Sequence, residues 1–127
     1  MVSQYDILIV DDSKLITKLL TEIIKSKGYT CRAVNNFSNA KEELNKHKPK
    51  LIFLDVNLPG SNGYEFCKRI KSTKKFNNIL VYYFTGVPEA EIAIKALETR
   101  ADGYLKKPFD MADFDDILQH LGQSSAV

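Results

Sequence analysis

Short apolar runs recur along the chain with amphipathic segments between them, and this pattern limits the possible folds more than any other feature. Two of these runs, Ile7–Val10 and Leu51–Leu54, are apolar at every position. A strand has this composition when both of its faces are covered, as at the centre of a parallel sheet. The remaining runs are Thr30–Val34, Ile79–Phe84 and a weaker Gly103–Leu105. The pattern predicts five strands with helices on both faces of the sheet.

The segments between these runs have apolar residues at helical spacing. The first helix is expected to begin after Asp12 or Ser13, which suit an N-cap, and to end before Gly28. In the second segment, Asn39 and Glu42 have the spacing of a capping box. The later helices are expected over Ser38–Lys46, Gly63–Ser72, Pro88–Glu98 and Asp110–Leu121.

Alternating strands and helices predict an α/β fold. Parallel strands joined through helices cross over right-handedly, so we expect a (βα)5 doubly wound, five-stranded parallel sheet in the flavodoxin-like order 2-1-3-4-5. A length of 127 residues suits one domain. We expect that domain over residues 1–121, and a flexible C-terminal tail or the stub of a linker over residues 122–127.

Composition and charge exclude several classes of protein. The net charge of +2 is small and evenly spread, so neither direct nucleic-acid binding nor a membrane partner is expected. No apolar run spans a membrane and Met1–Asp6 has no basic flank, so a cytoplasmic location is expected. Cys31 and Cys67 form no CxxC motif and lie far from His47 and His120, so we expect free thiols and no zinc or redox site.

Polar residues follow several strands at the edge where such a sheet binds ligands. That edge lies at the carboxyl ends of the strands, where the strand order reverses. The residues expected there are Asp11, Asp12, Asp55, Thr85 and Lys107. Neighbouring aspartates raise one another's pKa unless a cation offsets them, and oxygen ligands without His or Cys suit Mg²⁺ or Mn²⁺. Such a cluster can stabilise a transferring phosphoryl group, and one aspartate can serve as the nucleophile.

Four sequence motifs resemble, in order and spacing, those of the receiver domain of two-component response regulators of the chemotaxis-regulator type. They are Ile9-Val-Asp-Asp-Ser13, Leu54-Asp-Val-Asn-Leu-Pro-Gly60, Phe84-Thr-Gly86 and Gly103-Tyr-Leu-Lys-Lys-Pro-Phe109. The resemblance covers essentially the whole chain and implies that residues 1–121 are a receiver domain in a phosphorelay. It also implies a regulatory domain, not a conventional enzyme, that catalyses only its own phosphorylation and dephosphorylation.

The resemblance assigns roles to the acidic residues. Asp55 would be the phospho-acceptor, taking its phosphoryl group from a histidine kinase or a histidine phosphotransfer protein. Asp12 would bind Mg²⁺ directly, with Asp11 assisting through water. Asp55 itself and the backbone carbonyl of Asn57 would complete the protein ligands.

The resemblance also assigns the switch. Thr85 would hydrogen-bond a phosphoryl oxygen and Lys107 would form an ion pair with it. Tyr104 would be the aromatic side chain whose rotamer follows Thr85, and the Lys107-Pro108 bond would be cis. Phosphorylation would remodel the surface of helix four, strand five and helix five for a downstream protein target or for a phosphorylation-dependent dimer.

Two surface features carry further hypotheses. Leu15 and Leu19 widen the apolar stripe of the first helix, which includes Ile16. The three residues are a docking surface for the phosphodonor, or Leu15 and Leu19 are simply buried. Val87 offers no polar group to orient an attacking water, so we expect slow hydrolysis of the phosphorylated form.

Other interpretations remain open. Asp11 and Asp12 can merely cap the first helix, and Asp55 can be a turn residue ahead of Pro59-Gly60. For the whole chain, the alternatives are a receiver-like interaction module not regulated by phosphorylation, an Asp-nucleophile Mg²⁺ phosphatase and a flavin carrier. The phosphatase lacks its Asp-x-Asp motif here, and the acidic pair would repel the phosphate of a flavin.

Overall fold

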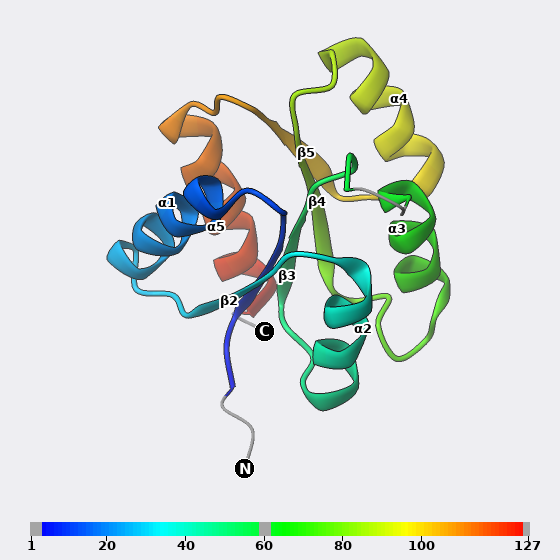
Figure 1. The fold of residues 1–127 in the computed structure, drawn as a ribbon, viewed down its shortest axis with the longest axis horizontal. Coiled ribbons are helices and arrows are strands. Elements are labelled where there is room, and N and C mark those ends of the chain that lie inside the picture. Colours follow the sequence, from blue (N-terminus) through cyan, green and yellow to red (C-terminus); the bar gives the residue numbers. More distant parts are fainter. Residues whose placement is uncertain (1–3, 59–61, 126–127) are drawn as a thin grey trace.

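The computed structural model describes residues 4–58 and 62–125, and its strands form one parallel sheet (Figure 1). The strands are β1 (Ile7–Val10), β2 (Cys31–Val34), β3 (Leu51–Leu54), β4 (Leu80–Thr85) and β5 (Gly103–Lys106). The helices are α1 (Lys14–Ser26), α2 (Phe37–Lys46), α3 (Gly63–Ser72), α4 (Glu89–Thr99) and α5 (Met111–Ser125). The strand order is β2-β1-β3-β4-β5. The predicted fold class and strand order are confirmed.

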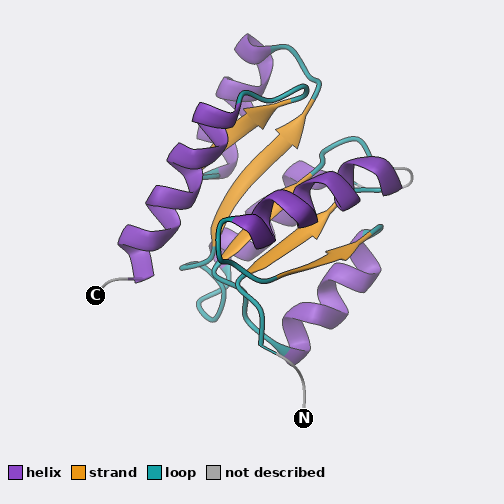
Figure 2. Ribbon diagram, turned by 90° about the vertical axis from the view of Figure 1, so that its left-hand side faces the viewer, coloured by secondary structure: helices purple, strands orange, loops and turns teal. Residues whose placement is uncertain are grey.

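Helices cover both faces of the sheet, with α1 and α5 on one face and α2, α3 and α4 on the other (Figures 1 and 2). Alternate residues of β1 point to the two faces, so Ile7 and Ile9 enter the core with α1 and α5. Leu8 and Val10 enter the core with α2, α3 and α4. All four are fully buried, and burying each side chain stabilises the fold by about 1.5–3 kcal/mol.

The strand register places the candidate site. Val10 pairs with Leu54, so the residues that follow β1 and β3 leave the sheet side by side. At the other side of β4, Thr85 pairs with Lys106, the last residue of β5. The carboxyl ends of four strands therefore meet along one edge.

The first helix begins and ends as predicted. The Ser13 hydroxyl accepts a hydrogen bond from the backbone N–H of Ile16 at 3.2 Å, and Gly28 has a φ of 89° just beyond the helix. The capping box predicted at Asn39 is wrong, because α2 begins earlier. Asn36 is its N-cap, and its side chain accepts from the N–H of Asn39 at 2.7 Å. The buried Phe37 fixes this earlier start.

The last helix is longer than expected. Helix α5 continues to Ser125, so residues 122–125, expected in a flexible tail or linker stub, are helical. Leu118 and Leu121 anchor the preceding turn in the core, and Gly122 lowers helix stability by only about 1 kcal/mol. Residues 126–127 and the turn expected at Pro59-Gly60 lie outside the described residues. None of the helices that the structure describes combines the length and apolar character of a membrane span.

Candidate functional site

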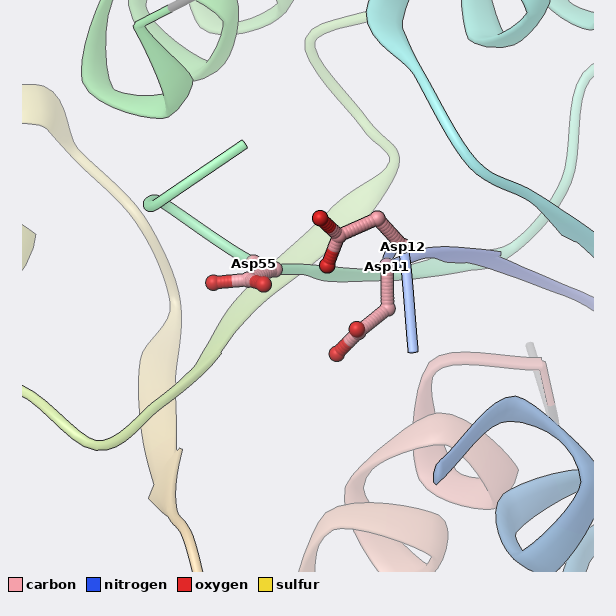
Figure 3. A group of neighbouring side chains, drawn as sticks. All are labelled: Asp11, Asp12 and Asp55. Atoms are coloured by element: carbon pink, nitrogen blue, oxygen red, sulfur yellow. The ribbon is translucent and has the colours of Figure 1, made fainter. Parts of the chain in front are cut away.

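Three aspartates converge at the carboxyl edge of the sheet (Figure 3). One carboxylate oxygen from each of Asp11, Asp12 and Asp55 lies within 4.8 Å of the others. Asp11 and Asp55 are buried, with 2% and 7% of their surface exposed, whereas Asp12 is exposed. Backbone hydrogen bonds hold the two strand ends together, since the N–H of Asp55 donates to the carbonyl of Val10 at 2.9 Å. The predicted acidic cluster is therefore present.

The Lys107 ammonium lies between two of these carboxylates. Its Nζ donates to Asp11 Oδ2 at 2.6 Å and lies 3.6 Å from Asp55 Oδ2. The same ammonium stands 4.8 Å from the centre of the Phe84 ring. The Lys107 N–H donates to the Thr85 carbonyl at 2.9 Å, and the Lys107-Pro108 bond is cis, as the resemblance implied. Lys107 therefore belongs to the cluster, as predicted.

Of the two buried carboxylates at this edge, Asp55 accepts fewer hydrogen bonds than Asp11. Its Oδ1 accepts one hydrogen bond, from the backbone N–H of Asn57 at 3.0 Å. Burial raises the pKa of Asp55, and the carboxylates of Asp11 and Asp12 add to that rise. The Asn57 N–H and the Lys107 ammonium act in the opposite direction. The other oxygen of Asp55, Oδ2, has the Lys107 ammonium at 3.6 Å as its partner, beyond hydrogen-bond distance.

The chemistry of these donors suits a hard cation. All three side chains offer carboxylate oxygens, and among the described residues the cluster contains neither His nor Cys. Mg²⁺ prefers such oxygen ligands and retains several waters of its own. Asp11 also accepts from the N–H of Ser13 at 2.9 Å, which fixes one of its oxygens. Asp12 and Asp55 accept fewer side-chain and backbone hydrogen bonds than Asp11 among the described residues.

The two predicted switch residues, Thr85 and Tyr104, differ in burial and in hydrogen-bond partner. Thr85 is fully buried at the end of β4, and its hydroxyl oxygen accepts from the N–H of Val87 at 3.1 Å. Tyr104 is half-buried, and its hydroxyl donates to Glu89 Oε1 at 2.9 Å. This bond to Glu89 raises the pKa of Tyr104. In this state Tyr104 is engaged with the first turn of α4.

Sequence reasoning missed a neighbouring lysine. The Lys106 ammonium donates to the carbonyl of Val87, in the loop that follows Thr85. The doubled Lys106-Lys107 in the sequence is the only hint of this contact. Together with the bond from Tyr104 to Glu89, it fastens the start of α4 to β5.

The predicted docking residues on α1 lie on its surface. Leu15 and Leu19 are 77% and 44% exposed, so the interpretation that they are simply buried is wrong. Ile16 is half-buried and packs against the core shared with α5. Cys31 and Cys67 are free, as expected, and burial raises the pKa of both thiols.

Comparison with known proteins gives a consistent match. A model of the response regulator receiver domain matches residues 7–119. Sporulation initiation phosphotransferase F of Bacillus subtilis is 34% identical over 89% of this chain and 90% of its own length. The phosphate regulon transcriptional regulatory protein PhoB of Pseudomonas aeruginosa is 36% identical over 81% of this chain. The chain spans only 45% of the length of that regulator.

Solved structures share the fold over nearly the whole chain. The signal receiver domain of a DNA-binding response regulator from Colwellia psychrerythraea superimposes with a TM-score of 0.87 and 25% identity, covering 94% of this chain and 99% of that one. The receiver domain of a signal transduction histidine kinase from Syntrophus aciditrophicus gives a TM-score of 0.85 and 28% identity, covering 96% and 92%.

Proposed function

Because this chain belongs to the response regulator receiver family, we propose that it is a phosphorylation switch in which Asp55 accepts the phosphoryl group. The observation that carries the proposal is the convergence of three carboxylates within 4.8 Å, with the Lys107 ammonium 3.6 Å from Asp55. A carboxylate oxygen that accepts no hydrogen bond and lies beside a lysine ammonium has the composition that phosphoryl transfer requires.

Three of the chain's own residues have defined roles in the transfer. An Asp55 oxygen attacks phosphorus in a phosphohistidine, the P–N bond breaks, and an acyl phosphate forms. Lys107 then pairs with a phosphoryl oxygen, and the Thr85 hydroxyl donates to another. Both groups stabilise negative charge on the transferring group, a contribution that reaches about 10²–10³ in rate for one donor in other enzymes.

The acidic cluster also fits a resident Mg²⁺ or Mn²⁺. Asp12 and Asp55 would hold it, with Asp11 acting through water and the Asn57 carbonyl as a backbone ligand. When bound, the cation neutralises charge on the phosphoryl oxygens. The buried Asp11 remains paired to Lys107, which keeps the ammonium beside the acceptor.

The conformational output would involve the surface of α4, β5 and α5. Thr85 would turn toward the phosphoryl group, and Tyr104 would leave Glu89 and turn inward. Exposed apolar side chains lie on this part of the molecule, Ile94 and Leu97 on α4 and Met111 at the start of α5. Such side chains suit a downstream protein target or a phosphorylation-dependent dimer. Phosphorylation needs to change the free-energy difference between these two conformations by only a few kcal/mol to shift their populations.

The expected phosphodonor is a histidine kinase or a histidine phosphotransfer protein, and the expected location is the cytoplasm. Leu15, Ile16 and Leu19 on α1 would contribute to donor docking. Leu15 and Leu19 are exposed on the helix that follows Asp12 in the chain, so a donor contacting them would bind near the acidic edge.

Intact-mass spectrometry with acetyl phosphate tests the proposal. We expect a single phosphoryl adduct that requires Mg²⁺ and is absent from Asp55→Asn. The matched control is Asp110→Asn, an exposed aspartate outside the cluster, which should behave as wild type. Equal labelling of wild type and Asp55→Asn would contradict the assignment of the acceptor.

A further inference from the structure

The boundary between α2 and α3 forms a groove whose lining contains none of the side chains that the proposed switch uses. One hollow of about 200 Å³ lies at the first turns of the two helices and is lined by Phe37 and Asn62. A second of about 110 Å³ lies toward their last turns and is lined by Leu44 and Phe76. Both hollows share Lys41, Phe66 and Arg69, so they adjoin, and together they are called the α2–α3 groove.

The floor of the groove is apolar and rigid. Phe37 from α2 and Phe66 from α3 stack with ring centres 4.9 Å apart, and each is only 6% exposed. Leu44 and Ile70 extend this floor and are 5% and 3% exposed. These side chains belong to the core, so the shape of the groove is set by core packing.

The rim of the groove is positively charged. Lys41 on α2 and Arg69 on α3 are exposed and line both hollows. Among the described residues neither makes an ion pair. Glu65 is the acidic residue that lines the groove, and its carboxylate pairs with Lys68 at 3.6 Å. Two cations, one from each helix, therefore border an apolar floor, and neither has an ion-pair partner among the described residues.

From this arrangement we propose that the α2–α3 groove docks an acidic peptide segment of a partner protein. An aliphatic or aromatic side chain of that segment enters a hollow, and flanking carboxylates pair with Lys41 and Arg69. This is the general mode in which a peptide with spaced apolar anchors occupies a groove between helices. The opposite charges accelerate association and set the orientation of the segment.

Charge and shape favour a peptide over other occupants. Single-stranded nucleic acid binds where ring faces are open to stacking, but Phe37 and Phe66 form a buried floor. A membrane surface needs a larger apolar face together with a cluster of basic residues. A short acidic segment with one apolar anchor matches hollows of this size.

One end of the groove is lined by Asn62, the N-cap of α3, which precedes Gly63. A Cβ built on Gly63, the first residue of α3, would stand 2.8 Å from the Cα of Val56 and 3.1 Å from the carbonyl oxygen of Asp55. Helix α3 therefore begins in direct contact with the Asp55 backbone. The docking proposal stands without phosphorylation, and its test uses the unphosphorylated protein.

Selection from a random library of short displayed peptides tests the proposal on the full chain. We expect enriched sequences that combine Asp or Glu with Leu, Ile or Phe. Their synthetic forms should bind wild type and lose about tenfold or more in affinity to Lys41→Glu/Arg69→Glu, by fluorescence anisotropy. The matched control is Lys46→Glu/Lys74→Glu, which reverses two exposed lysines near the same helices but outside the groove, and it should keep wild-type affinity.

Three outcomes would overturn the proposal. The first is a selection without an acidic and apolar consensus. The second is equal loss of affinity in the groove variant and the control variant, which would indicate non-specific charge attraction. The third is binding of oligothymidylate or of anionic phosphatidylserine vesicles that Lys41→Glu/Arg69→Glu abolishes, which would assign the groove to nucleic acid or lipid. Circular dichroism of both double variants checks that they fold.

Discussion

Two buried carboxylates, Glu43 and Asp55, are each 7% exposed but have opposite surroundings. Glu43 Oε1 accepts from the Tyr5 hydroxyl at 2.8 Å, and Oε2 accepts from Arg32 at 3.4 Å. Asp55 accepts one backbone N–H, and its nearest cation is 3.6 Å away. Burial removes water from both carboxylates, so each needs hydrogen bonds from the protein in its place. Glu43 accepts hydrogen bonds on both oxygens, whereas Asp55 accepts one on Oδ1. Equal burial therefore yields one structural carboxylate and one that stays available for chemistry.

Burial also acts on the pKa of Tyr5, the hydrogen-bond donor to Glu43, and on the pKa of Asp55. Burial and the hydrogen bond to Glu43 raise the pKa of the Tyr5 hydroxyl, which stays a neutral donor to the carboxylate. Burial raises the pKa of Asp55 itself, because its charged form has fewer partners. The fold thus tolerates an unfavourable charge at Asp55, as is common at functional sites.

Removing the Lys107 ammonium beside Asp55 should have the largest effect on the rate of phosphorylation. Lys107→Met should slow phosphorylation by acetyl phosphate about 100-fold, because the ammonium that stabilises the transferring charge is lost. It also leaves the buried Asp11 without its ion pair. Intact-mass spectra of samples quenched at successive times, with Mg²⁺ present, measure the rate. Lys106→Met is the matched control, since its ammonium contacts the Val87 carbonyl and not the carboxylates. Equal rates for both variants would refute the role of Lys107.

Neutralising Glu43, which accepts hydrogen bonds on both oxygens, should lower the stability of the fold and leave phosphorylation by acetyl phosphate unchanged. Glu43→Gln should lower the free energy of unfolding by about 1–3 kcal/mol, because the contacts to Tyr5 and Arg32 are weakened in a buried place. Urea denaturation measures this change. Glu42→Gln, exposed on the same helix, should change stability by no more than about 0.5 kcal/mol. Loss of phosphorylation in Glu43→Gln would break the contrast between the two carboxylates.

The lifetime of the phosphorylated form should depend on residue 87. Val87→Glu should speed phosphoryl loss by roughly three- to tenfold, because a carboxylate beside the site orients the attacking water. This acceleration is smaller than the one that a general base provides. Mass spectra taken over time after removal of the phosphodonor give both rates. Val87→Leu should hydrolyse like wild type. Identical decay of Val87→Glu and wild type would exclude this explanation.

Removing the charge of Asp55 should stabilise the fold slightly. The folded-state pKa is raised, so folding takes up protons between the unfolded value of 3.8 and the higher folded value, and stability falls as pH rises through that window. At neutral pH in EDTA, Asp55→Asn should therefore be more stable than wild type, by about 1 kcal/mol. Below the unfolded pKa the two proteins should converge. Parallel urea curves at both pH values test this sign, and a less stable Asp55→Asn at neutral pH would contradict it.

The sequence predicted regular features best where one local signal dominates. Runs such as Leu51–Leu54 reproduce their strand bounds, and Gly63–Ser72 reproduces its helix. Positions with competing signals were harder. Asn36 and Asn39 both suit an N-cap, and the core contact of Phe37 selects Asn36. Helix α5 outlasts Gly122 because its buried preceding turn outweighs the low propensity of glycine.

The members of the acidic cluster could be predicted because they follow strands whose register is fixed. Contacts between distant side chains left weaker signals. Glu43 lies one position before Leu44 and three after Ala40, on the apolar stripe of α2, and that placement is the hint that it needed a buried partner. Nothing in the sequence indicates that this partner is Tyr5, because the contact depends on tertiary packing across 38 positions.

Chemical mapping of the acceptor tests the account most directly. Acetyl phosphate and Mg²⁺ label the protein, borohydride reduces an aspartyl phosphate to homoserine, and peptide sequencing by mass spectrometry locates the change. The account predicts homoserine at position 55, with Asp11, Asp12 and Glu43 unmodified. Reduction at another carboxylate, or a stable adduct that leaves Asp55 unmodified, would contradict the claim that Asp55 is the carboxylate kept available for phosphoryl transfer.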